Sequence, residues 1–301
     1  MMIEQPNLLV QFSDALARRV DAAKPLVIAV RFAHGRHISG IAWRPDIVVT
    51  SEQSLPKRDE FEVIAVGEAV VTAKAVGRDP ATNIALLQMP ARTTSVSVGR
   101  NEVRPGAFAI ALGADGAGGA SARVGIVNIA GPEWHSSRGG LIDRRIVLDL
   151  RLARGEEGGP VLDASGSCIG MSTFGPRGQV LVIPATTIER VAPLLLKHGR
   201  IPRGWLGVAL QAVAVPDALV ASANQSSGLM VMSIVKDGPA AQAGILTGDI
   251  ILSVNGTPTH QVRKIARHFG SESIGRKADL RLIRGGAVMN VPTPISERPV
   301  L

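Results

Sequence analysis

Short apolar runs bounded by turn-forming residues are the main signal in the first two thirds of the chain. One stretch differs, because apolar residues recur three and four positions apart from Leu8 to Ala23 and predict a short amphipathic helix that ends near Lys24 and Pro25. After it come short segments rich in Val, Ile and Ala, separated by Gly, Pro, Asp or Asn at the spacing typical of an all-β sandwich or barrel. The predicted strands are 26–32, 37–43, 46–50, 61–67, 69–77, 83–89, 108–113, 122–130, 145–152, 160–163, 168–175 and 180–184.

The last third of the chain has a different pattern. Residues 185–200 predict a helix with one apolar side and Gly199 as its C-cap, and 201–204 predict a short linker. Strands and helices then alternate in a compact α+β unit. Its predicted strands are 205–210, 228–235, 249–256, 277–286 and 287–295, and its predicted helices are 238–244 and 259–270.

Composition fits a globular protein of about two domains. The 301 residues are 46% hydrophobic and 19% charged, which excludes wholesale disorder. Aromatic residues make up only 3%, so stacking sites for single-stranded nucleic acid are not expected. The net charge of +8 is scattered without a long basic run. It predicts a general attraction to acidic partners or anionic membrane surfaces, and no nucleic-acid site.

A single cysteine and the N-terminus complete this picture. Cys168 lies in an apolar strand pattern and predicts a buried, inert thiol, so neither a disulfide nor a cysteine-based metal site is expected. No metal or cofactor is predicted. No pattern of a secretory signal peptide or transmembrane helix is present. We therefore expect a cytoplasmic protein, or a periplasmic one if the N-terminus has been trimmed.

Four motifs carry the candidate chemistry and binding. They are VTSEQSL at 49–55, DPATNIA at 79–85, GEEGGP at 155–160 and GPAAQAGILTGDIILSVNGTPT at 238–259. Together they resemble the HtrA family of trypsin-like serine proteases followed by a PDZ domain, from about Phe12 to Pro299. The resemblance implies a mainly β protein: an N-terminal segment at 1–25, a chymotrypsin-like double β-barrel at 26–199 and an α+β PDZ domain at 204–301.

The resemblance places Gln53, Asn83 and Glu157 at the family's histidine, aspartate and serine positions. Acyl transfer by this mechanism needs a nucleophile, a base that takes its proton and an acid that orients the base. A glutamine cannot act as the base, and a neutral asparagine cannot stabilise an imidazolium. A glutamate is a poor acyl-transfer nucleophile. Because all three positions have changed, we predict a pseudoprotease rather than an enzyme with one inactivating mutation.

The glycines of GEEGGP allow a tight turn, which the resemblance identifies with the family's oxyanion-hole loop, at Gly155, Glu156 and Glu157. Two placements of Glu157 remain open at this point. Its carboxylate either folds into the backbone N–H groups of the site as a permanent internal anion, or it points to solvent. The adjacent pair could also do acid–base work, but neighbouring side chains on a turn usually diverge, so we expect solvated charges or a loop cap.

An active hydrolase with a displaced or non-classical site is the alternative function. His34 and His37 precede Gln53 by about one strand pair and could approach the cleft, while His135 lies in a polar loop with Ser136 and Ser137. None of them belongs to a recognisable serine–base–acid motif, so we expect exposed or capping histidines.

Peptide binding is the other activity that the resemblance implies. A PDZ domain binds the C-terminal carboxylate of a peptide, which adds as a strand beside the groove. The matching residues are Trp205, Leu206, Gly207, Val208 and Ile265, with Arg203 as an added positive charge. Alternatively, Trp205 and Val208 pack the domain junction.

We therefore predict an adaptor, chaperone or regulator in protein quality control that binds C-terminal peptides or unfolded proteins. The resemblance also implies a homo-oligomer, a trimer formed through the protease domain and the N-terminal segment, or a hetero-oligomer with an active relative. A purely structural subunit with a closed PDZ groove is a third alternative.

Overall fold

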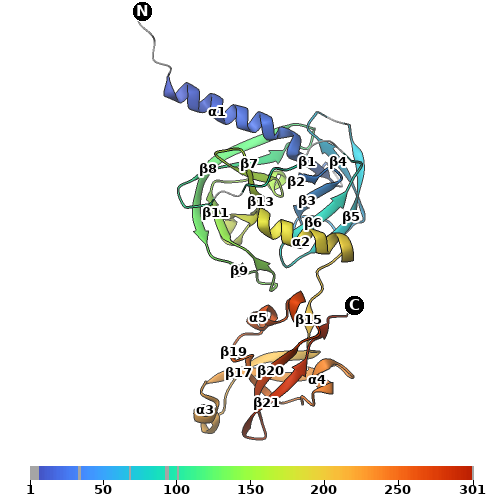
Figure 1. Ribbon diagram of the computed structural model, residues 1–301, viewed down its shortest axis with the longest axis vertical. Helices are drawn as coiled ribbons and strands as arrows, with labels where there is room; N and C mark the ends of the chain where they lie inside the picture. The colour runs from blue at the N-terminus through green and yellow to red at the C-terminus, as the bar shows by residue number, and fades with distance from the viewer. Residues whose placement is uncertain (1–6, 33–34, 68, 92–94, 100–101, 300–301) are drawn as a thin grey trace, which may run out of the picture. The chain divides into compact units, whose positions relative to one another are not determined.

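The computed structural model describes residues 7–299 apart from 33–34, 68, 92–94 and 100–101. The chain forms two compact units: Met1–Trp134 with Leu141–Arg200, and His135–Gly140 with Ile201–Leu301 (Figure 1). The second unit begins at Ile201 and also includes the short segment 135–140.

The N-terminal helix α1, Leu8–Ala23, is present as predicted and continues into the 3₁₀ turn η1, Lys24–Leu26. The Asn7 side chain caps it by accepting a hydrogen bond from the Leu9 N–H at 3.0 Å. Most of its side chains are exposed, including Leu8 and Leu9, and the Phe12 ring lies 5.5 Å from that of Phe108. The helix therefore has an apolar side that its own unit covers only in part.

Two closed six-stranded barrels follow, which confirms the predicted double-barrel fold. The first has the order β1-β2-β3-β6-β5-β4, with β1 Val27–Arg31, β2 His37–Arg44, β3 Ile47–Ser51, β4 Glu60–Ala65, β5 Val71–Asp79 and β6 Ile84–Gln88. The second has the order β11-β14-β13-β12-β7-β8, with β7 Phe108–Ala114, β8 Ala120–Gly131, β11 Arg145–Asp149, β12 Pro160–Asp163, β13 Cys168–Phe174 and β14 Val180–Pro184. A short pair, β9 Trp134–His135 and β10 Leu141–Ile142, was not predicted.

Branched aliphatic side chains fill both barrels, as the near absence of aromatic residues predicts. In each barrel they alternate with outward-facing residues, which places one side of every strand in the core. The buried clusters include Ile28, Val30, Ile38, Val48, Val63 and Leu87 in the first barrel and Ala111, Val127, Ile146, Val161 and Val182 in the second.

Cys168 is fully buried at the start of β13, which confirms the predicted structural role of its thiol. Burial raises the pKa of this thiol to about 12, so it stays protonated and unreactive near neutral pH.

Helix α2, Ala185–His198, follows the second barrel and ends as predicted at Gly199, whose φ of 70° is the left-handed conformation of a C-cap. The helix packs against β5 of the first barrel (Figure 1). A glycine is required at the contact, because a Cβ on Gly77 would lie 2.7 Å from the Cβ of Leu195. The helix thus connects the two barrels on the outside.

The second unit is an α+β domain with the sheet order β16-β17-β18-β20-β21, and β19 pairs with β18. Its strands are β16 Val208–Ala214, β17 Ser227–Ile234, β18 Ile250–Val254, β19 Thr257–Pro258, β20 Lys277–Arg284 and β21 Ala287–Pro294, with β15 Gly204–Trp205 paired to β22 Ser296–Glu297. Helix α4, Pro239–Gln242, was predicted, whereas α3, Asp217–Ala223, was not. The helix predicted at 259–270 is shorter: α5 covers Val262–Ile265 and continues as the 3₁₀ turn η4, Ala266–His268.

Candidate functional site

Gln53, Asn83 and Glu157 come together at one place between the two barrels. Gln53 follows β3, Asn83 precedes β6, and Glu157 lies between the 3₁₀ turn η2, Arg154–Glu156, and β12. The Gln53 Nε2 donates to Glu157 Oε1 at 2.6 Å, and the Gln53 backbone N–H donates to Asn83 Oδ1 at 2.7 Å. The three positions that the sequence singled out therefore form one chain of hydrogen bonds.

The Glu157 side chain is the centre of this network and is only 1% exposed. Its Oε1 accepts hydrogen bonds from Ser51 Oγ at 3.0 Å, Thr173 Oγ1 at 2.7 Å and the Phe174 N–H at 3.2 Å, besides the bond from Gln53. Its Oε2 accepts a hydrogen bond from Ser54 Oγ. The protein's own donors therefore satisfy both carboxyl oxygens without contact to water.

Asn83 takes part through its amide rather than through a charge. Its Nδ2 donates to Ser51 Oγ at 3.0 Å and to Thr173 Oγ1 at 2.8 Å, and both hydroxyls in turn donate to Glu157. The residue has a φ of 60°, a left-handed conformation that asparagine tolerates better than most residues. The amide therefore orients the hydroxyls toward the buried carboxylate.

The expectation that Glu157 could point to solvent is wrong, because the side chain turns inward. The hydrogen bonds described for its carboxylate come from the β3 loop and β13, not from the N–H groups of its own turn. Within that turn, the Glu156 N–H donates to Ala153 O at 3.0 Å and the Gly158 N–H to Ser172 O at 2.9 Å. The carboxylate is thus an internal anion held by groups other than the oxyanion-hole-like loop.

Gly158 shows how tightly this turn is held against the first barrel. Its φ is 93°, and a Cβ there would lie 2.2 Å from the backbone oxygen of Ser39. The Ser39 N–H donates to the backbone carbonyl oxygen of Glu157 at 2.8 Å. Only glycine fits this close approach, which explains why the turn keeps its glycines although the neighbouring side chains are those of glutamate.

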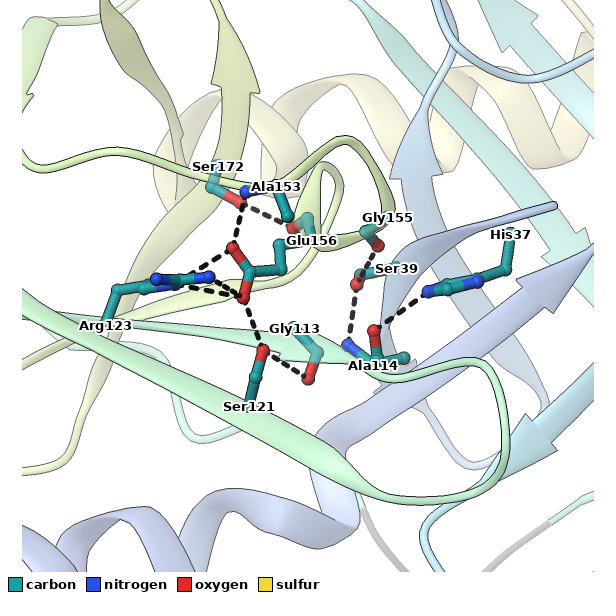
Figure 2. A network of polar contacts seen from close by, with 10 residues as sticks. All are labelled: His37, Ser39, Gly113, Ala114, Ser121, Arg123, Ala153, Gly155, Glu156 and Ser172. Atoms are coloured by element: carbon teal, nitrogen blue, oxygen red, sulfur yellow. Dashed lines mark hydrogen bonds and ion pairs between the residues drawn. The ribbon is translucent and has the colours of Figure 1, made fainter.

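Glu156 diverges from Glu157, as expected for neighbours on a turn, but it is not solvated: it is only 5% exposed. Figure 2 shows its carboxylate between Ser121, Arg123 and Ala153, on the side away from His37. It accepts from Ser121 Oγ at 2.7 Å, from the Ala153 N–H at 2.7 Å and from Arg123 Nε at 3.1 Å. Burial acts to raise the pKa of Glu156, but these hydrogen bonds outweigh it, so the pKa lies below its ordinary value.

His37 is the one histidine of the two near the cleft that the structure describes, because His34 lies outside the described residues. It lines an open pocket of about 880 Å³ together with Ser54, Gly155 and Phe174. Its Nε2 lies 3.0 Å from the Ala114 carbonyl oxygen (Figure 2). In the described part of the chain, His37 has no hydrogen bond to a serine, and the hydroxyl of Ser54 donates to Glu157.

A second pocket, of about 180 Å³, lies in the α+β unit, and all five predicted groove residues line it. Gly207 has a left-handed φ of 78°. Its carbonyl oxygen accepts a hydrogen bond from the Val235 N–H at 2.8 Å, and the Leu206 carbonyl oxygen accepts one from the Ala240 N–H at 2.8 Å. Leu206 and Ile265 are buried in the core of the unit, so they form the floor of the pocket rather than its rim. Arg203 and Arg298 add positive charge to the lining.

Among the described residues, no three side chains of His, Cys, Asp or Glu are grouped as a metal site would require. No helix in that part of the chain is long and apolar enough to cross a membrane.

Comparison with known proteins agrees with this architecture. Residues 38–171 match the trypsin-like peptidase domain family, and residues 205–295 match the PDZ domain family. A relative from Brucella suis, named a probable periplasmic serine endoprotease that is DegP-like, is 33% identical over 94% of this chain and 56% of its own length. The chain therefore spans about half the length of the curated relatives it matches.

Solved structures give the same result. The serine endoprotease from Yersinia pestis is 25% identical, with a TM-score of 0.72, and the match covers 94% of this chain and 98% of that one. The HtrA-type protease AlgW with a tripeptide is 26% identical, with a TM-score of 0.70 over 95% of this chain and 98% of that one. The names of these relatives describe proteases, and the Brucella name gives a periplasmic location, so the expected cytoplasmic location gains no support from them.

The buried Glu156 carboxylate predicts a specific loss of stability in acid. A carboxyl group whose pKa is lowered by folding stabilises the protein above its unfolded pKa, and this contribution is lost as the pH falls through the folded pKa. We expect Glu156→Gln to lower the free energy of unfolding at pH 7 by about 1–3 kcal/mol. The difference from wild type should shrink as the pH falls below the ordinary value of 4.5.

Urea unfolding at a series of pH values, followed by circular dichroism, measures this difference. Glu60→Gln is the matched control, since Glu60 is exposed and its ion pair with Lys74 spans 3.8 Å at the surface. If the difference in free energy of unfolding between wild type and Glu156→Gln stayed the same from neutral to acid pH, the stabilising role of the Glu156 carboxylate would be contradicted.

Proposed function

Because the chain belongs to the HtrA-like family of trypsin-fold proteins with a PDZ domain, we propose that it binds peptides and has lost serine-peptidase chemistry. One observation carries the proposal: the side chains at the three catalytic positions form a closed hydrogen-bonded network around a buried carboxylate. In this network no group is placed to attack a carbonyl carbon.

The chemistry of each position supports this conclusion. Gln53 cannot take up a proton near neutral pH, and its Nε2 is a donor already used by Glu157 and Thr173. Asn83 carries no charge that would stabilise a protonated base. The Glu157 oxygens are sealed from solvent, so a substrate carbonyl has no access to them. A base, an orienting acid and an accessible nucleophile are thus all missing from these positions.

The names of the relatives favour the alternative of an active hydrolase, since they describe serine endoproteases. A displaced site would have to use His37 and Ser54, which line the same pocket. The hydrogen bonds of these residues do not support it: His37 faces the Ala114 carbonyl and Ser54 faces Glu157, so base and hydroxyl are directed to different partners.

In the proposed function, the PDZ groove binds the free C-terminus of a peptide or of an unfolded chain. Support comes from Gly207, which has a left-handed backbone in the loop between β15 and β16, and from the apolar floor formed by Leu206 and Ile265. A chain of this kind acts as an adaptor, chaperone or regulator. Its ligands in the cell and the compartment in which it works stay predictions.

Self-association, as a trimer or together with an active relative, also stays a prediction. The apolar side of α1 supports it: Leu8, Leu9 and Phe12 are exposed, and Phe108 continues the same surface onto the second barrel. Sedimentation velocity of the full chain, compared with a Phe12→Asp variant, measures whether this surface joins protomers.

The absence of peptidase activity is tested with unfolded casein and a fluorophosphonate probe. We expect no labelling and no turnover, because the nucleophile, base and acid are missing. The Yersinia pestis endoprotease serves as the active control. Turnover or labelling that Ser54→Ala or His37→Ala abolishes, in variants shown to be folded, would contradict the proposed loss of chemistry.

Peptide binding by the PDZ groove is tested with one peptide in two forms, ending in an apolar residue with either a free carboxylate or an amide. We expect the amide to bind roughly 10- to 100-fold more weakly, since it loses charge-assisted hydrogen bonds to backbone N–H groups. Arg203→Gln should weaken binding of the free acid, while Lys277→Gln, an exposed residue on β20 outside the pocket, should not. Equal affinity for acid and amide, measured by fluorescence anisotropy, would argue against this groove function.

A further inference from the structure

The open pocket beside Glu157 has a lining whose charges are all of one sign. Of its ten lining residues, Arg36 and Arg154 carry positive charge and none is acidic. Both arginines are exposed, and no ion pair to an acidic side chain is described for either. The Arg36 guanidinium lies 5.6 Å from the centre of the Phe32 ring, a cation–π contact that keeps it at the pocket wall.

Nearby carboxylates do not cancel this charge. Glu157 is buried beneath the pocket with its oxygens bound by the protein's own donors, and Glu156 is paired with Arg123. Asp115 lies near His37, and its Oδ1 accepts the N–H groups of Ala117 and Gly119, at 2.8 Å each. Hydrogen bonds from these N–H groups keep the pKa of Asp115 low. Glu60 and Glu62 line an adjoining pocket, which also contains Arg31 and Arg58.

Four apolar side chains, those of Phe32, Ile38, Leu152 and Phe174, form much of the remaining wall, to which Ser54 adds a hydroxyl. A pocket of about 880 Å³ accommodates several side chains of an extended segment. Such a segment cannot pair with the backbone at Phe174, because Glu157 and Gln53 already use its N–H and carbonyl groups. Recognition here must therefore depend on side-chain charge and apolar contact, and not on strand addition.

We propose that this pocket is a second peptide-binding site, which takes a segment of a partner polypeptide with apolar residues flanked by Asp or Glu. The proposal rests on the proposed function, since a segment held here is bound and not cleaved. Arg36 and Arg154 bind the acidic side chains, and the apolar walls take the residues between them. The net charge of +8 draws acidic segments toward the protein. A polypeptide fits better than a nucleic acid, because the lining offers two arginines but no run of cations along a phosphate backbone.

The test uses the full chain and a short fluorescent peptide of alternating Leu and Asp or Glu, acetylated and amidated so that the PDZ groove has no carboxylate to bind. We expect this peptide to bind, and its Asn/Gln counterpart to bind roughly 10- to 100-fold more weakly. The double variant Arg36→Glu with Arg154→Glu should bind the acidic peptide no more tightly than its Asn/Gln counterpart. Arg104→Glu with Arg145→Glu, two exposed arginines outside the pocket, is the matched control with the same change of net charge.

A second pair, Arg36→Gln with Arg154→Gln, should show the same loss and guards against misfolding by the charge reversals. Equal binding of the acidic and amide peptides would overturn the inference, as would equal loss in the control pair or tighter binding of a single-stranded oligonucleotide. Mass spectrometry of the bound peptide separates this result from the proposed function: hydrolysis would overturn the loss of catalysis, whereas failure to bind an intact peptide would overturn this inference alone.

Discussion

A carboxyl group buried away from water needs hydrogen-bond partners, because an uncompensated charge in the interior lowers the stability of the fold by several kcal/mol, on the order of 3–5. Glu157 meets this requirement where the two barrels face each other. Its donors come from the loop after β3 in one barrel and from β13 in the other, and Gln53 and Thr173 are both among them. One charge therefore ties together the three segments that a serine peptidase would use for catalysis.

The remaining features of the site follow from this arrangement. The turn that carries Glu157 has to approach β2 closely, which Gly158 permits, and the neighbouring Glu156 anchors the same turn to β8 through Arg123. Because both carboxylates turn away from it, the open pocket beside the turn has Arg36 and Arg154 as its charged lining residues. The PDZ groove depends on separate contacts within its own unit, so peptide binding there does not require an intact catalytic centre.

Most of the fold could be predicted from the sequence, because the strands are short runs rich in Val, Ile and Ala and because Gly, Pro, Asp and Asn mark their ends. The meeting of Gln53, Asn83 and Glu157 could be predicted from the motifs around them. The inward turn of Glu157 could not, since it depends on hydroxyls of Ser51, Ser54 and Thr173 that only the folded chain brings together. Helix α3 was missed although Asn224, in a left-handed C-cap conformation, was a signal for its end.

The buried Glu157 carboxyl group is held in place by the hydroxyls and amides around it. A double-mutant cycle of Glu157→Gln and Ser54→Ala measures this directly, because the one hydrogen bond described for the Ser54 hydroxyl goes to Glu157. We expect a coupling free energy of about 1–3 kcal/mol in the unfolding of the barrel unit, the range for a buried hydrogen bond that loses one partner. Additive effects of the two changes, with a coupling near zero, would contradict it.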